Sequence, residues 1–110
     1  MEELFWYWRG ASGQKYIHSV YDLDACPPLP GAVYVGVRRN GHLRVAMAVG
    51  RFEQFWDKTL GLDDFAMLES LGATEVHVHL LAKGSEAAEA VKSDLARALS
   101  QAAALTVYAD

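Results

Sequence analysis

Residues 32–49 carry the sequence AVYVGVRRNGHLRVAMAV, which decides the fold. Two runs rich in β-branched residues flank an Asn40-Gly41 pair within it. Asn-Gly is strongly favoured in two-residue hairpin turns, because both central positions of a type I′ turn need a positive φ. We therefore predict an antiparallel hairpin whose turn is Asn40-Gly41 and in which Tyr34 pairs with Met47.

The aromatic segment near the N-terminus predicts another hairpin, over residues 4–21. Its strands are rich in aromatic and β-branched side chains, which favour extended backbone, and residues 10–13 form a turn with two glycines. Alternation along the strand puts Trp6 and Trp8 on one face and Tyr7 on the other. The three rings cannot all point the same way, so these residues either cover the core or leave one face of the hairpin open to a partner, and the sequence favours neither alternative.

The C-terminal half of the chain changes to helical patterns. The spacing of apolar residues predicts a helix over 52–60 and a second short helix that begins at Asp63. A third strand is predicted over 74–82, followed by a long alanine-rich helix over 86–104 and an extended segment at 105–108. This order of elements predicts the α+β class, with an antiparallel sheet covered by helices.

Composition places the chain among small globular domains. Of its 110 residues, 52% are hydrophobic and 22% are charged, so a single domain over 1–110 has enough apolar side chains for a core. The single Cys26 and the lack of an apolar run long enough to cross a bilayer predict a cytoplasmic protein with no membrane partner. The net charge of −4 argues against sequence-independent nucleic-acid binding.

The stretch from residue 30 to 51 resembles the core of the GIY-YIG nuclease family. Pro30-Gly31-Ala32-Val33-Tyr34 is similar to the first motif of that family with one extra residue, and Ala48-Val49-Gly50-Arg51 is similar to the second. The later helices and third strand follow in the family's order. The resemblance therefore covers residues 30–104, leaves the hairpin at 4–21 as an addition, and implies a three-stranded antiparallel core.

The resemblance also implies a nuclease site made of a tyrosine, an arginine and a metal-binding carboxylate on the last helix. The matching candidates in this chain are Tyr34, Arg51 and Asp94. The chain departs from the family because Ala48 replaces the second tyrosine and the helix predicted over 52–60 contains no arginine. A two-residue turn would also put Tyr34 and Ala48 on opposite faces of the sheet. We therefore predict a degenerate and catalytically inactive form of this scaffold.

The function predicted from these features is a non-catalytic binding or regulatory module that engages a protein, as an inhibitor or accessory factor does. The alternative is a divergent DNA endonuclease of GIY-YIG type, which would use Tyr34, Arg51 and Asp94 with magnesium or another divalent ion; otherwise we expect no cofactor. Weak nucleic-acid binding by arginines and formation of a homo-oligomer are further alternatives. The residues predicted to bind a partner are Trp6, Tyr7, Trp8, Arg9, Arg38, Arg39 and Arg44.

Two histidines, His77 and His79, suggest a separate alternative. At positions i and i+2 of a strand they share one face, a geometry suited to a transition-metal ion if Glu75, His18 or His42 supplies a third ligand. The simpler interpretation, and the one we adopt, is a partly exposed, hydrogen-bonded strand face without metal.

Overall fold

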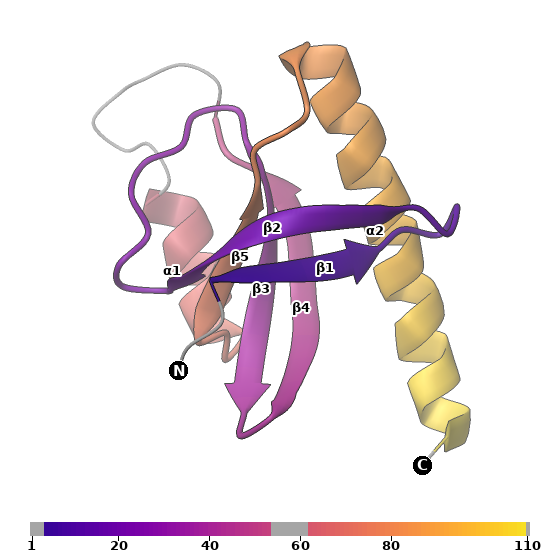
Figure 1. Cartoon of the computed structure of the whole chain (residues 1–110). Coiled ribbons are helices and arrows are strands. Elements are labelled where there is room, and N and C mark those ends of the chain that lie inside the picture. The colour runs from indigo at the N-terminus through magenta and orange to yellow at the C-terminus, as the bar shows by residue number, and fades with distance from the viewer. Residues whose placement is uncertain (1–3, 54–61, 110) are drawn as a thin grey trace.

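The computed structural model describes residues 4–53 and 62–109, which form one sheet and two helices (Figure 1). The sheet is antiparallel throughout, with the strand order β1-β2-β5-β3-β4, so the fold belongs to the α+β class as predicted. The elements are β1 (Phe5–Arg9), β2 (Lys15–Asp22), β3 (Val33–Asn40), β4 (Leu43–Arg51), α1 (Leu62–Ser70), β5 (Glu75–His79) and α2 (Gly84–Ala109).

The central strand of the sheet is β5, although it is the last strand along the chain. It pairs with β2 on one side and with β3 on the other, and all five of its residues are buried. The strand predicted over 74–82 is therefore present but shorter, because Leu80 and Leu81 follow it as exposed residues. The prediction that the histidine face is partly exposed is wrong, because both His77 and His79 are buried.

The turn of the β3–β4 hairpin is Gly41-His42, and not Asn40-Gly41 as predicted. Asn40 pairs with Leu43, and Gly41 has a φ of 64°. A single glycine with positive φ at the first central position is the pattern of a type II′ turn, in which the second position needs no positive φ. Asn40 can therefore remain in the strand.

A β-bulge after Gly36 shifts the register of this hairpin once more. Tyr34 lies opposite Gly50, so the predicted pairing with Met47 is wrong, and Gly36 lies opposite Ala48. Tyr34 and Ala48 consequently share a face, contrary to the prediction. The ring of Tyr34 covers Gly50, where an added Cβ would come within 2.5 Å of the tyrosine Oη. This close approach explains why the position is glycine.

The two faces of the sheet carry separate apolar cores. Alternate residues of β3 divide between them: Val33, Val35 and Val37 pack toward α2, whereas Tyr34 packs toward α1. The α2 side contains Tyr16, Val33, Val35, Val37, Ala88 and Leu95. The α1 side contains Tyr34, Phe52, Leu68, Ala73, Val76 and Val78.

The last helix is longer than the sequence pattern suggested. α2 begins at Gly84 and continues through Ala109, so the prediction of an extended segment at 105–108 is wrong. The alanine run at 102–104 favours helix, and neither glycine nor proline follows to end it. Of the helix predicted over 52–60, only residues 52 and 53 are described, and they are not helical. No helix within the described ranges is long and apolar enough to cross a bilayer.

The sheet curls rather than lying flat. The β1–β2 hairpin crosses over β3 and β4, and the free side of β1 faces the β3–β4 turn (Figure 1). Trp8 of β1 consequently packs against the core on the α2 side, together with Ala46 and Val49 of β4. The two edge strands, β1 and β4, therefore both pack against the apolar core on the α2 side of the sheet.

Candidate binding site

The outer edge of β1 carries backbone groups that no described strand pairs with. The Val20 amide donates to the Leu4 carbonyl, and the Gly10 amide donates to the Gln14 carbonyl, so the even-numbered residues of β1 bond to β2. Hydrogen-bonded and non-hydrogen-bonded pairs alternate in an antiparallel ladder. The N–H and C=O groups of Phe5, Tyr7 and Arg9 therefore point away from β2, toward the free edge.

The side chains at these positions are also open to solvent. Phe5 is 57% exposed and Tyr7 is 60% exposed, and Leu4 just before them is exposed as well. The register of β1 against β2 is regular from Phe5 to Arg9. An apolar edge of this kind, with no described strand paired to it, is a template for another strand.

The opposite edge of the sheet, β4, is built differently. The bulge after Gly36 interrupts its ladder with β3, and bulges twist an edge away from regular pairing. The two edges therefore differ in how readily they accept a further strand, and β1 is the more receptive edge.

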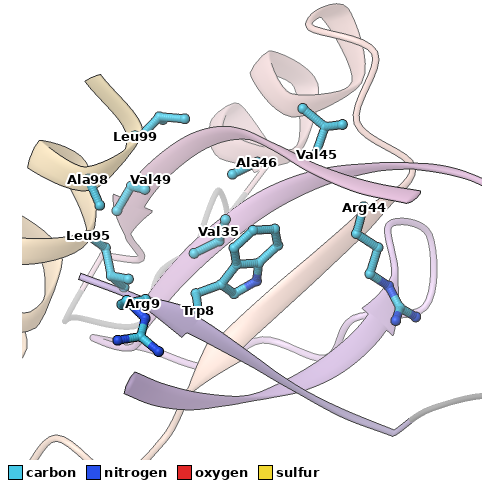
Figure 2. A pocket seen from close by; sticks show the side chains of 10 residues that line it. All are labelled: Trp8, Arg9, Val35, Arg44, Val45, Ala46, Val49, Leu95, Ala98 and Leu99. Atoms are coloured by element: carbon cyan, nitrogen blue, oxygen red, sulfur yellow. The ribbon is translucent and has the colours of Figure 1, made fainter. Parts of the chain in front are cut away.

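A cavity of about 540 Å³ lies between β1, β3, β4 and α2 (Figure 2). Figure 2 shows Trp8 in its centre and the apolar side chains of α2 along one side, while the guanidinium of Arg44 points away from that side. Its volume falls within the range of about 300–1,000 Å³ that is usual for ligand sites. Its walls are formed by Trp8, Val35, Val45, Ala46, Val49, Leu95, Ala98 and Leu99, with Arg9 and Arg44 also lining it.

A buried chain of hydrogen bonds fixes Trp8 in place. Its indole Nε1 donates to Nδ1 of His77 at 2.9 Å, so that nitrogen carries no proton. The proton of the neutral ring therefore lies on Nε2, which donates to Oε1 of Glu75 at 2.9 Å. Burial lowers the pKa of His77 below its usual value, even though Glu75 acts in the opposite direction. His77 is thus held as a neutral imidazole of one tautomer.

Glu75 is a buried carboxylate held by several donors. Arg44, whose side chain is only 4% exposed, donates from Nε at 2.9 Å, and Nη1 of Arg39 lies 3.5 Å from the other oxygen. Burial by itself would raise the pKa of Glu75, but the hydrogen bonds from Arg44 and His77 outweigh it and hold the pKa below its usual value. The guanidinium of Arg44 also lies 4.5 Å from the centre of the Trp6 ring.

These contacts divide the residues predicted to bind a partner. Trp6 and Trp8 are partly buried, whereas Tyr7 and Arg9 are exposed, and Arg9 also borders the cavity. Arg44 forms an ion pair with the carboxylate of Glu75, and Arg39 forms a second ion pair with the same carboxylate. The arginines near the turn therefore do not form one open cationic surface, although the Arg38 side chain is exposed.

The three nuclease candidates are not brought together. Tyr34 packs on the α1 side, where its hydroxyl donates to Asp64 at 2.7 Å. Burial, followed by this hydrogen bond, raises the pKa of Tyr34, which disfavours a phenolate base. Arg51 bonds to Gly31 and to α2, whereas Asp94 bonds to the β1–β2 turn, so each has a separate set of partners.

Asp94 joins α2 to the β1–β2 turn. Its two oxygens accept the Ser12 amide at 2.8 Å, the Ser12 hydroxyl at 2.6 Å and the Tyr16 hydroxyl at 2.8 Å. The Ser12 hydrogen bond is the main cause of the lowered pKa of Asp94, with Tyr16 and Arg97 contributing. This carboxylate therefore has the contacts of a structural residue that fixes the end of β1.

The histidines are placed by hydrogen bonds. His79 bonds through Nδ1 to the Ile17 carbonyl at 2.7 Å, and both ring nitrogens of His77 are engaged. Within the described part of the chain, no group of three or more histidine, cysteine or acidic side chains has a geometry that could hold a metal ion.

The cavity and the hydrogen bonds of Asp94 to the β1–β2 turn could not be predicted from the sequence. Ser12 and Asp94 are 82 positions apart, and nothing in local periodicity relates them. No local pattern predicted the cavity, because its walls come from β1, β3, β4 and α2, which are far apart in the sequence. In comparisons with protein-family models, curated proteins and solved structures, no match to this chain is found.

Proposed function

We propose that this chain is a non-catalytic binding module that takes up an extended segment of a different protein as an additional strand along β1. The observation that carries the proposal is the position of the unpaired edge of β1 beside the apolar cavity. Trp8 and Arg9 belong to that strand and also line the cavity. Strand addition of this kind obtains affinity from main-chain hydrogen bonds and specificity from pockets for alternate side chains.

Both faces of an added strand would find apolar partners. Its side chains on the inner face would enter the cavity beside Trp8, and those on the outer face would lie next to Phe5 and Tyr7 as cross-strand neighbours. Large apolar anchors in a desolvated pocket supply most of the binding energy in protein interfaces. The matching segment therefore alternates between a bulky apolar residue and a residue that packs on an aromatic ring.

Charge at the end of β1 indicates the kind of partner. Arg9 and Lys15 form a cross-strand pair of like charge, and both are exposed. An acidic side chain in the added strand would relieve this repulsion. β1 itself carries no acidic residue, and Glu2 and Glu3 precede it in the sequence. The segment that fits this edge therefore has an acidic residue at one end. The lone thiol fits a place in the cytosol.

The nuclease alternative has less support. It needs a tyrosine, an arginine and a carboxylate around one phosphate. Here Tyr34, Arg51 and Asp94 have separate partners, and Tyr34 packs on the face of the sheet opposite α2.

The test is affinity purification from extract with the full chain and three variants. Tyr7→Pro removes an N–H from the free edge without removing a bond to β2, and Ala98→Phe fills the cavity. Leu81→Thr is the matched control, because Leu81 is an exposed leucine away from β1. We expect a partner that is retained by wild type and by Leu81→Thr, and lost from both other variants, all four proteins having the same circular dichroism.

Two results would contradict the proposal. One is retention of every specific partner by both Tyr7→Pro and Ala98→Phe. The other is self-association through β1, seen as a dimer that Tyr7→Pro converts to a monomer, since that would make the chain its own partner.

A further inference from the structure

The walls of the apolar cavity beside β1 are mainly aliphatic. Eight of its ten lining residues are apolar, and seven of those eight are valine, leucine or alanine. The eighth is Trp8, whose indole N–H donates to His77 and is therefore not available to a ligand. Val35 is buried in the wall, whereas Val45 is 52% exposed, so the cavity is open to solvent beside Val45. A molecule that enters it from solvent therefore needs an apolar body.

Two guanidinium groups border this apolar space, on opposite sides of the Trp8 ring (Figure 2). The Arg44 guanidinium is used inside the protein, because it donates to the buried carboxylate of Glu75 at 2.9 Å. The Arg9 guanidinium has one bond to the protein, from Nη1 to the Gly13 carbonyl at 3.3 Å. Its Nε and Nη2 groups have no partner among the described residues. Arg9 is therefore the side chain that can bind the polar end of a ligand.

The charges around the cavity favour an anion at the Arg9 end. None of the described residues that line the cavity is acidic. Glu75 has an ion pair with Arg44, and Asp94 of α2 has one with Arg97. Arg9 has no ion pair with a described residue, so positive charge is in excess at its end of the cavity although the chain as a whole carries −4.

We propose that this cavity binds a medium-chain aliphatic carboxylate, with the alkyl chain inside the cavity and the carboxylate on the guanidinium of Arg9. A guanidinium and a carboxylate form two parallel hydrogen bonds, which fix the orientation of the ligand. The alkyl chain has no hydrogen-bonding group, so it loses none when it enters walls that offer none. The proposal identifies a small-molecule site, and it stands whether or not a strand is added along β1.

The head group distinguishes this ligand from other amphiphilic molecules of the same length. An alcohol makes the same apolar contacts but forms no ion pair with Arg9. An alkylammonium ion makes the same contacts and is repelled by Arg9. A carboxylate that fills the cavity would also compete with the side chains of an added strand, and this consequence alone rests on the proposed function.

Calorimetric titration of the purified full chain tests the proposal without any partner protein, so its result does not depend on strand addition. The probes are hexanoate, octanoate and decanoate, with octanol and octylammonium for comparison, all below the concentrations at which they form micelles. We expect affinity to rise about threefold to fourfold with each added methylene, because each one buries further apolar surface. Octanoate should bind more tightly than octanol and octylammonium.

Three substitutions separate the two parts of the site. Arg9→Gln and Lys83→Gln each remove one positive charge, but only Arg9 lines the cavity. We expect octanoate affinity to fall about threefold or more in Arg9→Gln and to stay unchanged in Lys83→Gln, with octanol affinity unchanged in both. Ala98→Phe fills the cavity and should abolish the binding of octanoate and of octanol.

Three outcomes would overturn the proposal. The first is an absence of saturable octanoate and decanoate binding to the wild-type chain. The second is binding of octanol or octylammonium as tight as that of octanoate, and the third is an equal loss in Arg9→Gln and Lys83→Gln. The first two are measured on the wild-type chain, so the proposal stays testable even if Ala98→Phe fails to fold.

Discussion

The indole nitrogen of Trp8 and Nδ1 of His77 form a hydrogen bond of 2.9 Å between residues 69 positions apart. The bond reaches from the edge strand β1 over β2 to the central strand β5. It fixes the tautomer of His77 and positions the indole ring that lies at the centre of the apolar cavity (Figure 2). The binding surface at β1 is therefore anchored in the middle of the sheet.

Trp8→Phe should destabilise the fold by about 2 kcal/mol, because it leaves the buried Nδ1 of His77 without a donor. The matched control is Trp6→Phe, since the indole N–H of Trp6 makes no hydrogen bond with any described residue and its ring contact with Arg44 is retained. This control should cost less than about 1 kcal/mol. Urea unfolding followed by circular dichroism measures both, and equal losses would show that the Trp8–His77 bond contributes nothing.

Acidification should destabilise the protein before the carboxylates titrate. Burial lowers the pKa of His18 from 6.5 to about 4, opposed by its bond to the Tyr16 carbonyl and assisted by the neighbouring His79 and His77. The unfolded chain then binds the proton more tightly than the folded chain. The free energy of unfolding therefore falls as the pH decreases from about 6.5 toward 4, by up to about 3 kcal/mol for this group.

Urea unfolding between pH 7.5 and 4.5 tests this, with His18→Phe as the comparison. The variant should lose much of the pH dependence above pH 5, and the remainder belongs to His77, whose pKa is also lowered. Below about pH 4.5 the lowered pKa values of Glu75 and Asp94 add a further loss. A wild-type stability that stays constant from pH 7 to 5 would contradict the assignment of His18 as a buried neutral imidazole.

Asp94→Asn should cost about 2 kcal/mol, because an amide offers one acceptor oxygen where the carboxylate accepts three hydrogen bonds from Ser12 and Tyr16. Arg97→Gln is the control, since Arg97 is 69% exposed and lies 3.5 Å from the same carboxylate. That substitution should change stability by less than about 0.5 kcal/mol. Thermal unfolding compares the two, and a variant Asp94→Asn as stable as wild type would refute the structural role.

Tyr34→Phe should lower stability by about 1 kcal/mol through loss of the bond to Asp64, and should leave partner retention unchanged. The reason is that Tyr34 packs on the α1 side of the sheet, whereas the cavity lies on the α2 side. If this variant lost partner binding while its circular dichroism stayed unchanged, the binding surface would lie on the α1 side of the sheet, and that would contradict the proposal.

The strands could be predicted from the sequence because their signals are local. Aromatic and β-branched runs marked both hairpins, and alternation correctly assigned Val76 and Val78 to the face opposite His77. The register could not be predicted, because it depends on which residue of Asn40-Gly41-His42 leaves the strand and on a bulge after Gly36. Both are decided by packing across the sheet.

The candidate site could be predicted only in part. The open aromatic face at Tyr7 follows from alternation, since adjacent side chains of a strand point in opposite directions. The hydrogen bond from Arg44 to Glu75 does not, because the two residues lie on β4 and β5, which are separated by β3 in the sheet and do not pair with each other. The cavity could not be predicted either, because it forms where the curl of the sheet brings β1 close to β4.

Photo-cross-linking tests strand addition at β1 most directly. One variant carries benzoylphenylalanine in place of Tyr7, and a control variant carries it in place of Leu81. Both positions are exposed. The account predicts that the probe at position 7 cross-links an extended, partly apolar segment of a different protein, and that the probe at position 81 does not. Equal cross-linking of that protein from both positions, or cross-linking from position 81 alone, would contradict it.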